Sequence, residues 1–470
     1  MTDLAIVGSG SAAFAAAITA RRAGRSVVMI ESGIVGGTCV NTGCVPSKAL
    51  LTAAAARHDA AEAGRFPGIT AGAASVDLDE LMTGKAALVE QLRATKYADV
   101  AAYHGWEIIS GQARLAEGPS LVVDVRGGDR REIVAGAYLI ATGASAWIPP
   151  IRGLDEVGYL TSTTAMELTE LPEKLLVIGG NAVGLEQAQM LARLGAEVTI
   201  VEARDRLAPF AEPELSEVLE EALRGEGIAV HTGTTVRRVR RDEGVIHASL
   251  AGPDGLAAEL DVEQVLVATG RLPNTAALNL GSVAVEVGPR GEVVVDECLR
   301  TTNPVIWAAG DVTGGAQFVY VAAAQGDLAA DNALGTANRR IDYRALPQVT
   351  FTSPALASVG LTQSQAEDLG LAAEVRVVPM SVVPRSIVNR DPVGVIKLVA
   401  ESESGRLLGV HIASENAGEV IAAATLALRA GMSVDDLAST WSPYLTTAEA
   451  LKLAAQAFTG DVTKLSCCAV

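Results

Sequence analysis

Four of the five cysteines form two close pairs, and paired sulfurs are suited to redox or metal chemistry. Cys39 and Cys44 stand five residues apart in GGTCVNTGCVPSK, while Cys467 and Cys468 are adjacent in the closing SCCAV. Five cysteines in 470 residues are too few for a disulfide-stapled secreted scaffold, so we expect a cytoplasmic protein with reduced thiols. Thiolates are also the ligands that soft metal ions prefer. We therefore predict that all four bind metal or exchange electrons, and that Cys298 is a structural thiol.

The spacing of the inner pair bears on whether its sulfurs can meet. In a regular α-helix this spacing separates the Cα atoms by roughly 8 to 9 Å, whereas a disulfide needs less than about 7 Å. Gly43 and Pro46 indicate that the segment is not a regular helix, so Cys39 and Cys44 can be drawn together. We predict a redox-active disulfide here; two buried structural thiols are the alternative.

The elements that would position this pair begin with a nucleotide-binding pattern at residues 4–32. A short apolar run turns at Gly8-Ser9-Gly10, continues as an Ala-rich helix and is followed by a second strand that ends on Glu31. Gly8 permits the tight turn, Gly10 the approach of phosphates, and Ala13 close helix packing, while Glu31 can accept from ribose hydroxyls. The helix N-terminus supplies free N–H donors for a pyrophosphate.

The same pattern recurs at the same offset in KLLVIGGNAVGLEQAQMLARLGAEVTIVEA. Gly8, Ala13 and Glu31 correspond to Gly179, Gly184 and Glu202. Asn181 replaces the middle glycine, and we expect it to preserve the turn because Asn tolerates left-handed backbone angles. Two patterns in register predict two bound dinucleotides; the alternative is two ordinary helix–strand turns.

Later segments extend this organisation and limit the partners. Two predicted strands end in Ala-Thr-Gly, and a third ends on Gly310-Asp311, where Asp311 can accept from a ribityl or ribose hydroxyl. From about residue 346, strands alternate with two Ala-rich helical stretches. A net charge of −18 and the lack of a long apolar run argue against nucleic-acid and membrane partners. The glycines and threonine that end the first two strands are Thr142, Gly143 and Gly270.

The cysteine motif, the paired fingerprints and AAGD resemble the flavin-dependent pyridine nucleotide–disulfide oxidoreductases over essentially the whole chain. The resemblance implies an α/β, glutathione reductase-like fold with two Rossmann-like domains and an α+β dimerisation domain. It implies FAD in residues 1–148 and 271–345, a nicotinamide nucleotide in 149–270, and a homodimer through 346–470. Gly37 and Thr38 would also contact the FAD.

The resemblance also implies roles for individual residues. Cys44 would contact the flavin, Cys39 would face the substrate, and Lys48 and Glu186 would pair beside the flavin. For the nucleotide, Glu202 suits the free ribose hydroxyl of NADH, whereas Arg204, with Arg206 nearby, could receive the 2′-phosphate of NADPH. The family leans to NADPH, which we expect, with NADH as the alternative.

The C-terminal segment distinguishes among members of the family. Relatives that reduce disulfides carry a His-Pro followed by Glu; Glu449 is present here, but Tyr444 holds the histidine position. A phenol with a pKa near 10 is a poor proton shuttle at neutral pH. The tail FTGDVTKLSCCAV instead resembles that of mercuric reductases, in which vicinal cysteines would deliver Hg(II), arriving as a thiolate complex, to the partner subunit's inner pair. By the same resemblance Tyr97 and Tyr444 would line the metal site.

Two alternative functions stay open at this point. One is a dihydrolipoamide dehydrogenase-like or other disulfide reductase with an unusual base. Another is a flavoprotein whose thiols only bind and buffer soft metals. Mercuric reductases often carry an N-terminal metal-binding domain, whereas the first predicted strand here begins at residue 4; we therefore expect a catalytic core or a natural short form.

Overall fold

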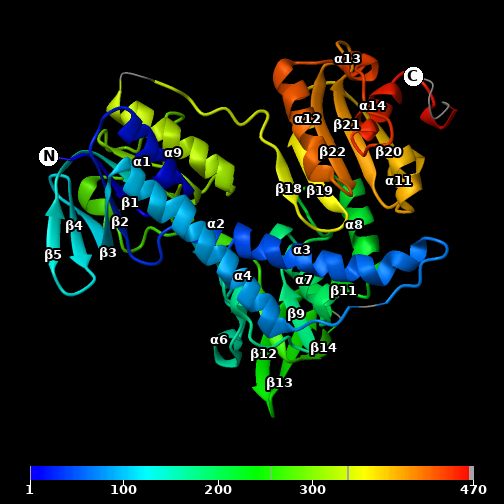
Figure 1. The fold of residues 1–470 in the computed structure, drawn as a ribbon, viewed down its shortest axis with the longest axis horizontal. Helices are drawn as coiled ribbons and strands as arrows, with labels where there is room; N and C mark the ends of the chain where they lie inside the picture. The colour runs from blue at the N-terminus through cyan, green and yellow to red at the C-terminus, as the bar shows by residue number, and fades with distance from the viewer. Residues whose placement is uncertain (1, 73, 254, 256, 336–337, 465–470) are drawn as a thin grey trace.

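The first of three regions is built on a seven-stranded sheet (Figure 1). The computed structural model describes residues 2–464 apart from 73, 254, 256, 336 and 337. β1, β2, β6 and β17 are parallel, and β3 joins β2 on one side and the antiparallel β4 and β5 on the other. The strands, in spatial order, are β17 (Ile306–Ala308), β6 (Ala135–Ile140), β1 (Thr2–Val7), β2 (Val27–Glu31), β3 (Glu107–Ala116), β4 (Ser120–Val125) and β5 (Arg130–Ile133).

The second region repeats the parallel arrangement. Its five-stranded sheet has the order β11 (Ala229–His231), β10 (Glu197–Val201), β9 (Lys174–Ile178), β15 (Gln264–Val267) and β8 (Leu160–Thr161). An antiparallel sheet of β12 (Thr235–Asp242), β13 (Val245–Ala251) and β14 (Ala257–Val262) lies below it in Figure 1. The two chain crossings between the regions pair with each other as β7 (Ala144–Ala146) and β16 (Arg271–Pro273).

The third region is an antiparallel sheet covered by helices. Its order is β18 (Gln348–Thr350), β19 (Ala355–Gly360), β22 (Leu407–Ser414), β21 (Val395–Glu401) and β20 (Ala373–Pro379). The remaining helices of this region are α10 (Gln363–Asp368), α11 (Pro384–Asn389), α12 (Ala417–Ala430), α13 (Val434–Ser439) and α14 (Glu449–Gln456). The neighbouring strands β21 and β22 are buried along almost their whole length, so they form the rigid core of this region.

Small residues let helices of the first region pack closely. The Ala-rich α1 (Ser11–Arg22) lies beside α9 (Val319–Leu334), as Figure 1 shows. A Cβ on Gly326 of α9 would lie only 2.0 Å from the Ala12 carbonyl oxygen, so no other residue fits that position. The helix that opens the first nucleotide pattern is thereby held by a segment more than 300 positions away in the sequence.

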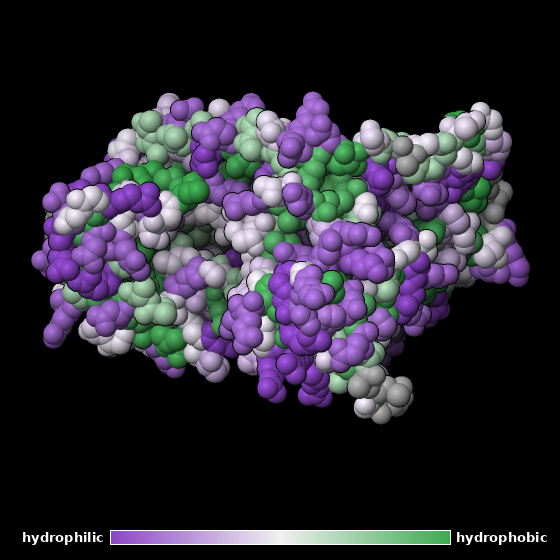
Figure 2. Space-filling view, turned by 90° about the horizontal axis from the view of Figure 1, so that it is seen from below, coloured by the Kyte–Doolittle hydropathy of each residue, from purple (hydrophilic) through white to green (hydrophobic). Residues whose placement is uncertain are grey.

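Between the regions, α3 (Cys44–Ala61) runs across the middle of the molecule beside α7 (Ala182–Leu194) and below the third sheet (Figure 1). Hydrophilic side chains cover most of the lower face, and apolar ones gather in and beside a hollow (Figure 2). Among the residues that the structure describes, no helix is both long and apolar enough to cross a membrane.

Candidate active site

A break between two helices brings Cys39 and Cys44 together. α2 (Gly37–Asn41) is followed by its C-cap residue Thr42, and α3 begins with Cys44 as its first residue. Gly43 occupies the break, where a Cβ would lie 2.9 Å from the Thr38 carbonyl oxygen. The expected interruption of the helix is confirmed, although Pro46 lies inside the first turn of α3, where a proline is tolerated.

The two sulfurs form one hydrogen-bonded pair with one favoured thiolate. Both are free thiols, and the Cys39 thiol hydrogen-bonds Cys44. This bond, helped by the positive charge of Lys48 and opposed by burial, lowers the pKa of Cys44 to about 7. Donating that hydrogen bond, together with burial, raises the pKa of Cys39. The N-terminus of α3 favours the same thiolate, so the reduced pair has its negative charge on Cys44.

Lys48 and Glu186 form the predicted ion pair and tie it to the third region. Lys48 Nζ lies 2.7 Å from Glu186 Oε2. The other carboxylate oxygen of Glu186 accepts the Phe351 backbone N–H at 2.9 Å, and the ammonium lies 4.7 Å from the Phe351 ring centroid. Glu186 is only 7% exposed, so this is a partly desolvated pair that holds its geometry more firmly than a surface one.

Tyr97 lies beside the cysteines at a local irregularity of its helix. α4 (Leu78–Arg93) continues as a π-helical turn, η2 (Ala94–Ala98), before α5 (Asp99–His104). The Tyr97 ring packs edge-on against Phe14 with centroids 4.8 Å apart, and its hydroxyl hydrogen-bonds Ser11. Burial raises the pKa of Tyr97, and the negative charge of the neighbouring cysteine pair adds to this effect. The phenol therefore stays protonated beside the thiols, as a donor of hydrogen bonds.

The first nucleotide pattern surrounds a cavity of about 340 Å³ that Gly8, Glu31 and Thr142 line. A Cβ on Gly8 (φ +109°) would lie 2.2 Å from the Ala141 carbonyl oxygen, where β6 ends. Glu31 accepts from the Ser9 hydroxyl and the Gly33 N–H, both at 2.6 Å, so its carboxylate is oriented before any ligand arrives.

The phosphate end of this site is made of backbone. Gly10 precedes α1 without any side chain capping the first N–H groups of the helix. Gly37 packs onto Gly10 so closely that a Cβ on it would lie 2.6 Å from the Gly10 Cα. Ala13 is buried in the first turns of α1, and Thr38 follows Gly37 in α2. Uncapped donors beside a close glycine contact fit the pyrophosphate of FAD.

The other end of the site holds a half-buried charge pair near Cys44. Asp311 Oδ2 lies 3.8 Å from Arg271 Nε, and burial raises the pKa of Asp311 while it lowers that of Arg271. Gly310 adopts a φ of +83° and its N–H donates to Gln325 Oε1 at 2.6 Å. A half-buried carboxylate whose cation lies 3.8 Å away, beyond hydrogen-bond distance, can still accept a hydrogen bond from a ribityl hydroxyl of the flavin.

The second pattern lines a larger cavity of about 850 Å³. Gly179 repeats the contact of Gly8, since its Cβ would lie 2.5 Å from the Ala268 carbonyl oxygen at the end of β15. Glu202 accepts from the Gly180 N–H at 2.6 Å and from the Arg204 N–H at 2.8 Å. The cavity is lined by Gly179, Asn181, Glu202, Arg204, Gly270 and Arg271, among others.

Two details of the second pattern differ from the expectation or sharpen it. Asn181 does not use left-handed angles: its backbone is extended, with φ −111° and ψ −178°, so the turn needs no such tolerance there. Gly184 is required by packing, because a Cβ would lie 2.0 Å from the Gly179 carbonyl oxygen. Of the two arginines, Arg204 lines the cavity with its guanidinium 4.7 Å from the Phe210 ring centroid. Arg206 instead donates to the Pro209 and Ala211 carbonyls.

The C-terminal candidates are only partly described. Tyr444 is 48% exposed in the loop before α14. Glu449 is buried at the start of α14, where burial raises its pKa and the Leu445 N–H donates to it. Cys467 and Cys468 lie outside the described residues. Within the described part of the chain, no cluster of three or more His, Cys, Asp or Glu side chains could hold a metal ion.

Three contributors to the site were not identified from the sequence. Ser9 joins the Gly36 N–H to Glu31, Phe351 holds Glu186, and Arg271 lies near both Asp311 and Cys44. The Arg that follows Ala-Thr-Gly was a usable signal for Arg271, whereas the contacts of Phe351 depend on distant packing. Cys298, by contrast, is a buried thiol that bonds Asn338 Oδ1 at 3.1 Å, as its structural assignment predicts.

Comparison with known proteins agrees with this site. The family model of pyridine nucleotide-disulphide oxidoreductases matches residues 2–326, and the model of their dimerisation domain matches residues 346–455. The mercuric reductase of Streptomyces lividans is 59% identical over 99% of this chain and 98% of its own length. That of Staphylococcus aureus is 46% identical over 99% of this chain and 84% of its own length.

Solved structures give the same fold. The HOCl-induced flavoprotein disulfide reductase RclA from Escherichia coli has a TM-score of 0.85 at 31% identity, covering 97% of this chain and 99% of its own. LpdA from Mycobacterium tuberculosis has a TM-score of 0.86 at 28% identity, covering 98% of this chain and 100% of its own. The predicted fold class is confirmed, and the chain belongs to the pyridine nucleotide-disulphide oxidoreductases, in the group of the mercuric reductases.

Proposed function

We propose that the protein reduces Hg(II) to Hg(0) with electrons from a nicotinamide nucleotide, using Cys39 and Cys44 as the sulfurs that exchange electrons and hold the metal. The observation that carries this proposal is the reduced pair itself, in which Cys44 has a pKa of about 7 and hydrogen-bonds Cys39. A soft cation presented to a thiolate and an adjacent thiol is bound by both, because thiolates are its preferred ligands.

FAD, when bound, supplies the transfer of two electrons from the nucleotide to the Cys39–Cys44 disulfide and later to the metal. The chain's own residues then exchange ligands. The Cys44 thiolate replaces one thiolate of the incoming Hg(II) complex, and Cys39 replaces the second as its proton passes to the released thiol. Two electrons reduce Hg(II) to Hg(0), which leaves because it has little affinity for thiolate. Tyr97 would orient the bound metal from the side of Cys39.

This chemistry does not use the acid–base group that a disulfide substrate requires. Cleaving a disulfide leaves a thiolate that must be protonated, which suits a histidine. None of the five histidines lies in the last fifty residues, and Tyr444 occupies the corresponding position. Releasing Hg(0) needs no such donor, so the residues present suit metal reduction better than disulfide reduction.

We further assign residues 1–148 and 271–345 to FAD, 149–270 to the nucleotide and 346–470 to dimerisation. The match of the dimerisation-domain model supports a homodimer. Figure 1 shows that the last described residues, η7 (Val462–Lys464), lie at the outer end of the third region, whereas α2 lies near the middle of the molecule. This placement favours delivery of metal by Cys467 and Cys468 to the partner subunit's inner pair, with Tyr444 at the same interface.

For the nucleotide we propose NADPH, with NADH as the alternative. Arg204 lines the cavity and could receive a 2′-phosphate, while the oriented carboxylate of Glu202 favours a free ribose hydroxyl. We place the enzyme in the cytoplasm, where reduced thiols persist and NADPH is supplied.

The assay that tests the function measures NADPH oxidation, with and without Hg(II), in the presence of excess small thiol. We expect the enzyme to oxidise NADPH only when Hg(II) is present and to release Hg(0) as it does so. Turnover of lipoamide or glutathione disulfide at a comparable rate would favour a disulfide reductase instead. Tight Hg(II) binding without any metal-dependent NADPH oxidation would indicate a flavoprotein that only buffers soft metals.

A further inference from the structure

A buried lysine stands in the middle of the third sheet. Lys397 belongs to β21 and is only 2% exposed. All the remaining residues from Val395 to Ala400 are apolar and belong to the core. Its ammonium lies 3.0 Å from Glu212 Oε2 and 2.9 Å from Glu214 Oε1. Both carboxylates come from the start of α8 (Pro213–Gly225), which belongs to the second region. The cluster therefore joins the nucleotide region to the third sheet.

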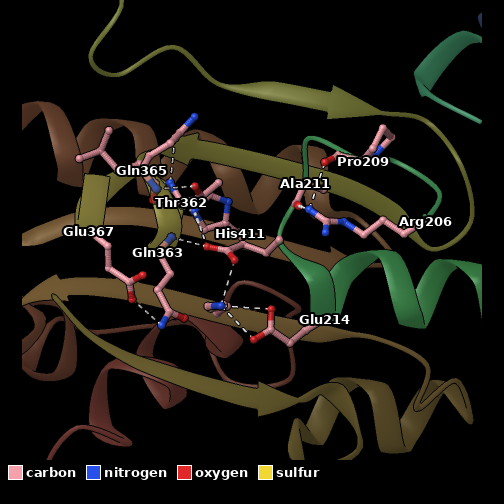
Figure 3. Close-up of polar contacts among 12 residues, drawn as sticks. Arg206, Pro209, Ala211, Glu214, Thr362, Gln363, Gln365, Glu367 and His411 are labelled. Carbon is pink, nitrogen blue, oxygen red and sulfur yellow. Dashed lines mark hydrogen bonds and ion pairs between the residues drawn. The ribbon is translucent and has the colours of Figure 1, made fainter. Parts of the chain in front are cut away.

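Glu212 is held from several sides. It is 3% exposed, and its second oxygen accepts the Gln363 N–H at 2.6 Å, at the start of α10. His411 faces it from β22 across from Lys397, with Nε2 3.9 Å from Glu212. That nitrogen donates to the Leu361 carbonyl at 2.9 Å, and burial lowers the pKa of His411, so the imidazole is neutral. Figure 3 shows Glu214, Gln363 and His411 converging from these three elements.

The segment that precedes Glu212 forms one wall of the nucleotide cavity. We call residues 203–212 the nucleotide loop; of these, Ala203, Arg204, Pro209 and Phe210 line the cavity. Arg206 stiffens the loop by donating to the Pro209 and Ala211 carbonyls (Figure 3). The loop thus runs between two buried glutamates: Glu202 is fixed by backbone N–H groups at one end, and Glu212 is fixed by Lys397 at the other.

The placement of these charges suggests a positional role. Replacing a whole buried ion pair by apolar residues of similar size is often neutral or stabilising, so an ion pair is not needed at this place merely to hold the core together. A charge-assisted hydrogen bond specifies a position more narrowly than apolar packing does. Here the specified position is that of Glu212, two residues from the cavity-lining Phe210.

We propose that Lys397 and Glu212 anchor the nucleotide loop to the third sheet and thereby set the affinity for the nicotinamide nucleotide. Lys397 is a positioning residue, since it acts on the cavity through Glu212 and the loop. The inference rests on the proposed use of this cavity by NADPH or NADH. It makes nucleotide affinity depend on the region that the family uses for dimerisation.

The test uses the FAD-loaded enzyme with Lys397→Met and, separately, Glu212→Gln. Glu212→Gln is nearly isosteric and can still accept from the Gln363 N–H, so it carries the test if Lys397→Met does not fold. We expect the Kd for NADP⁺ and NAD⁺, measured by calorimetry, and the KM for the reduced nucleotide to rise about fivefold to tenfold. We expect kcat at saturating nucleotide and the KM for Hg(II) to stay within about twofold of wild type.

Arg193→Met is the matched control. Arg193 forms a mostly buried ion pair with Glu226 in the same region, at 2.6 Å and with side chains 8% and 15% exposed, but neither residue belongs to the nucleotide loop. It should lower the melting temperature without changing the nucleotide Kd. If Lys397→Met and Glu212→Gln lower the melting temperature but bind nucleotide as wild type does, the anchor is wrong. If the wild-type enzyme binds neither nucleotide, the proposed function fails and the anchor fails with it.

Discussion

The Lys48 ammonium lies 2.7 Å from the Glu186 carboxylate, one helical turn after Cys44 on α3. This pair links the helix of the cysteines to α7, the helix of the second nucleotide pattern, because Glu186 belongs to α7. Glu186 also accepts the Phe351 N–H from the end of β18. The three regions of the chain therefore meet at the charge that stabilises the reactive thiolate.

The pH at which Cys44 becomes reactive should depend on Lys48. With a pKa of about 7, Cys44 is a thiolate above neutral pH and a thiol below it, so alkylation of the reduced enzyme should rise through that value. Lys48→Met removes the positive charge that helps to lower the pKa of Cys44. The pH at which labelling is half-maximal should therefore rise by about one pH unit. The measurement is the rate of iodoacetamide labelling against pH, with mass spectrometry to assign the site. An unchanged midpoint would show that Lys48 does not act on the thiol.

Tyr97→Phe should show what the Tyr97 hydroxyl contributes, because the variant keeps the ring and removes only the hydroxyl. The ring packs on Phe14, so the variant should lose only about 1 kcal/mol of the free energy of unfolding, the value of one hydrogen bond to Ser11. If the phenol orients the metal, kcat/KM for Hg(II) should fall about tenfold, or about 1.4 kcal/mol of transition-state stabilisation. Tyr103→Phe, at an 87% exposed position on the neighbouring α5, is the control and should match wild type. Equal kcat/KM in the two variants would remove Tyr97 from the site.

Cys467→Ala/Cys468→Ala should affect only the delivery of metal. The inner cysteines and the residues that line the two nucleotide cavities all come from residues 7–317, so reduction of the Cys39–Cys44 disulfide by NADPH should proceed at the wild-type rate. Turnover of Hg(II) presented as a dithiolate complex should fall at least about tenfold, because the variant lacks the adjacent pair of thiols that would bind the metal at high effective concentration. Wild-type turnover of that complex would show that the metal reaches Cys39 by another route.

Nucleotide preference should respond in opposite directions to two neighbouring changes. Glu202→Gln removes the charge that repels a 2′-phosphate and should raise kcat/KM for NADPH relative to NADH by about tenfold. Arg204→Ala should lower the same ratio by about tenfold, the value of one charge-assisted hydrogen bond. Arg206→Ala is the control: its guanidinium binds the loop's own carbonyls, so both nucleotides should lose affinity equally. If Arg206→Ala alone changed the ratio, the phosphate site would be misassigned.

Local turn chemistry made much of this site predictable from the sequence. Gly8 and Gly179 are needed because each packs against the alanine carbonyl of an Ala-Thr-Gly segment. Both the glycines and these segments are short motifs that can be recognised in the sequence. The break at Gly43 was predictable for the same reason, since a Cβ there would collide with Thr38. Asn181 was wrongly expected to use left-handed angles, because a turn in this position can also be made with extended backbone.

Contacts between distant segments were not predictable in this way. Phe351 meets Glu186 across 165 positions of the sequence, and Lys397 meets Glu212 across 185. The sequence around Phe351 or Lys397 does not indicate a glutamate partner. Each of these two contacts forms only when the sheets of different regions pack together. The low pKa of Cys44 likewise depends on the direction of a hydrogen bond from Cys39, which spacing alone does not determine.

The proposed role of the inner cysteines is tested most directly by comparing Cys39→Ala with Cys298→Ala in Hg(II)-dependent NADPH oxidation under excess small thiol. Removing Cys39 takes away both a metal ligand and the hydrogen bond that lowers the pKa of Cys44, whereas Cys298 is a buried thiol bonded to Asn338. We expect Cys39→Ala to lose at least about a hundredfold of turnover, because it removes one residue of a cooperating pair. We expect Cys298→Ala to stay near wild type. Wild-type turnover by Cys39→Ala would contradict the proposed relay.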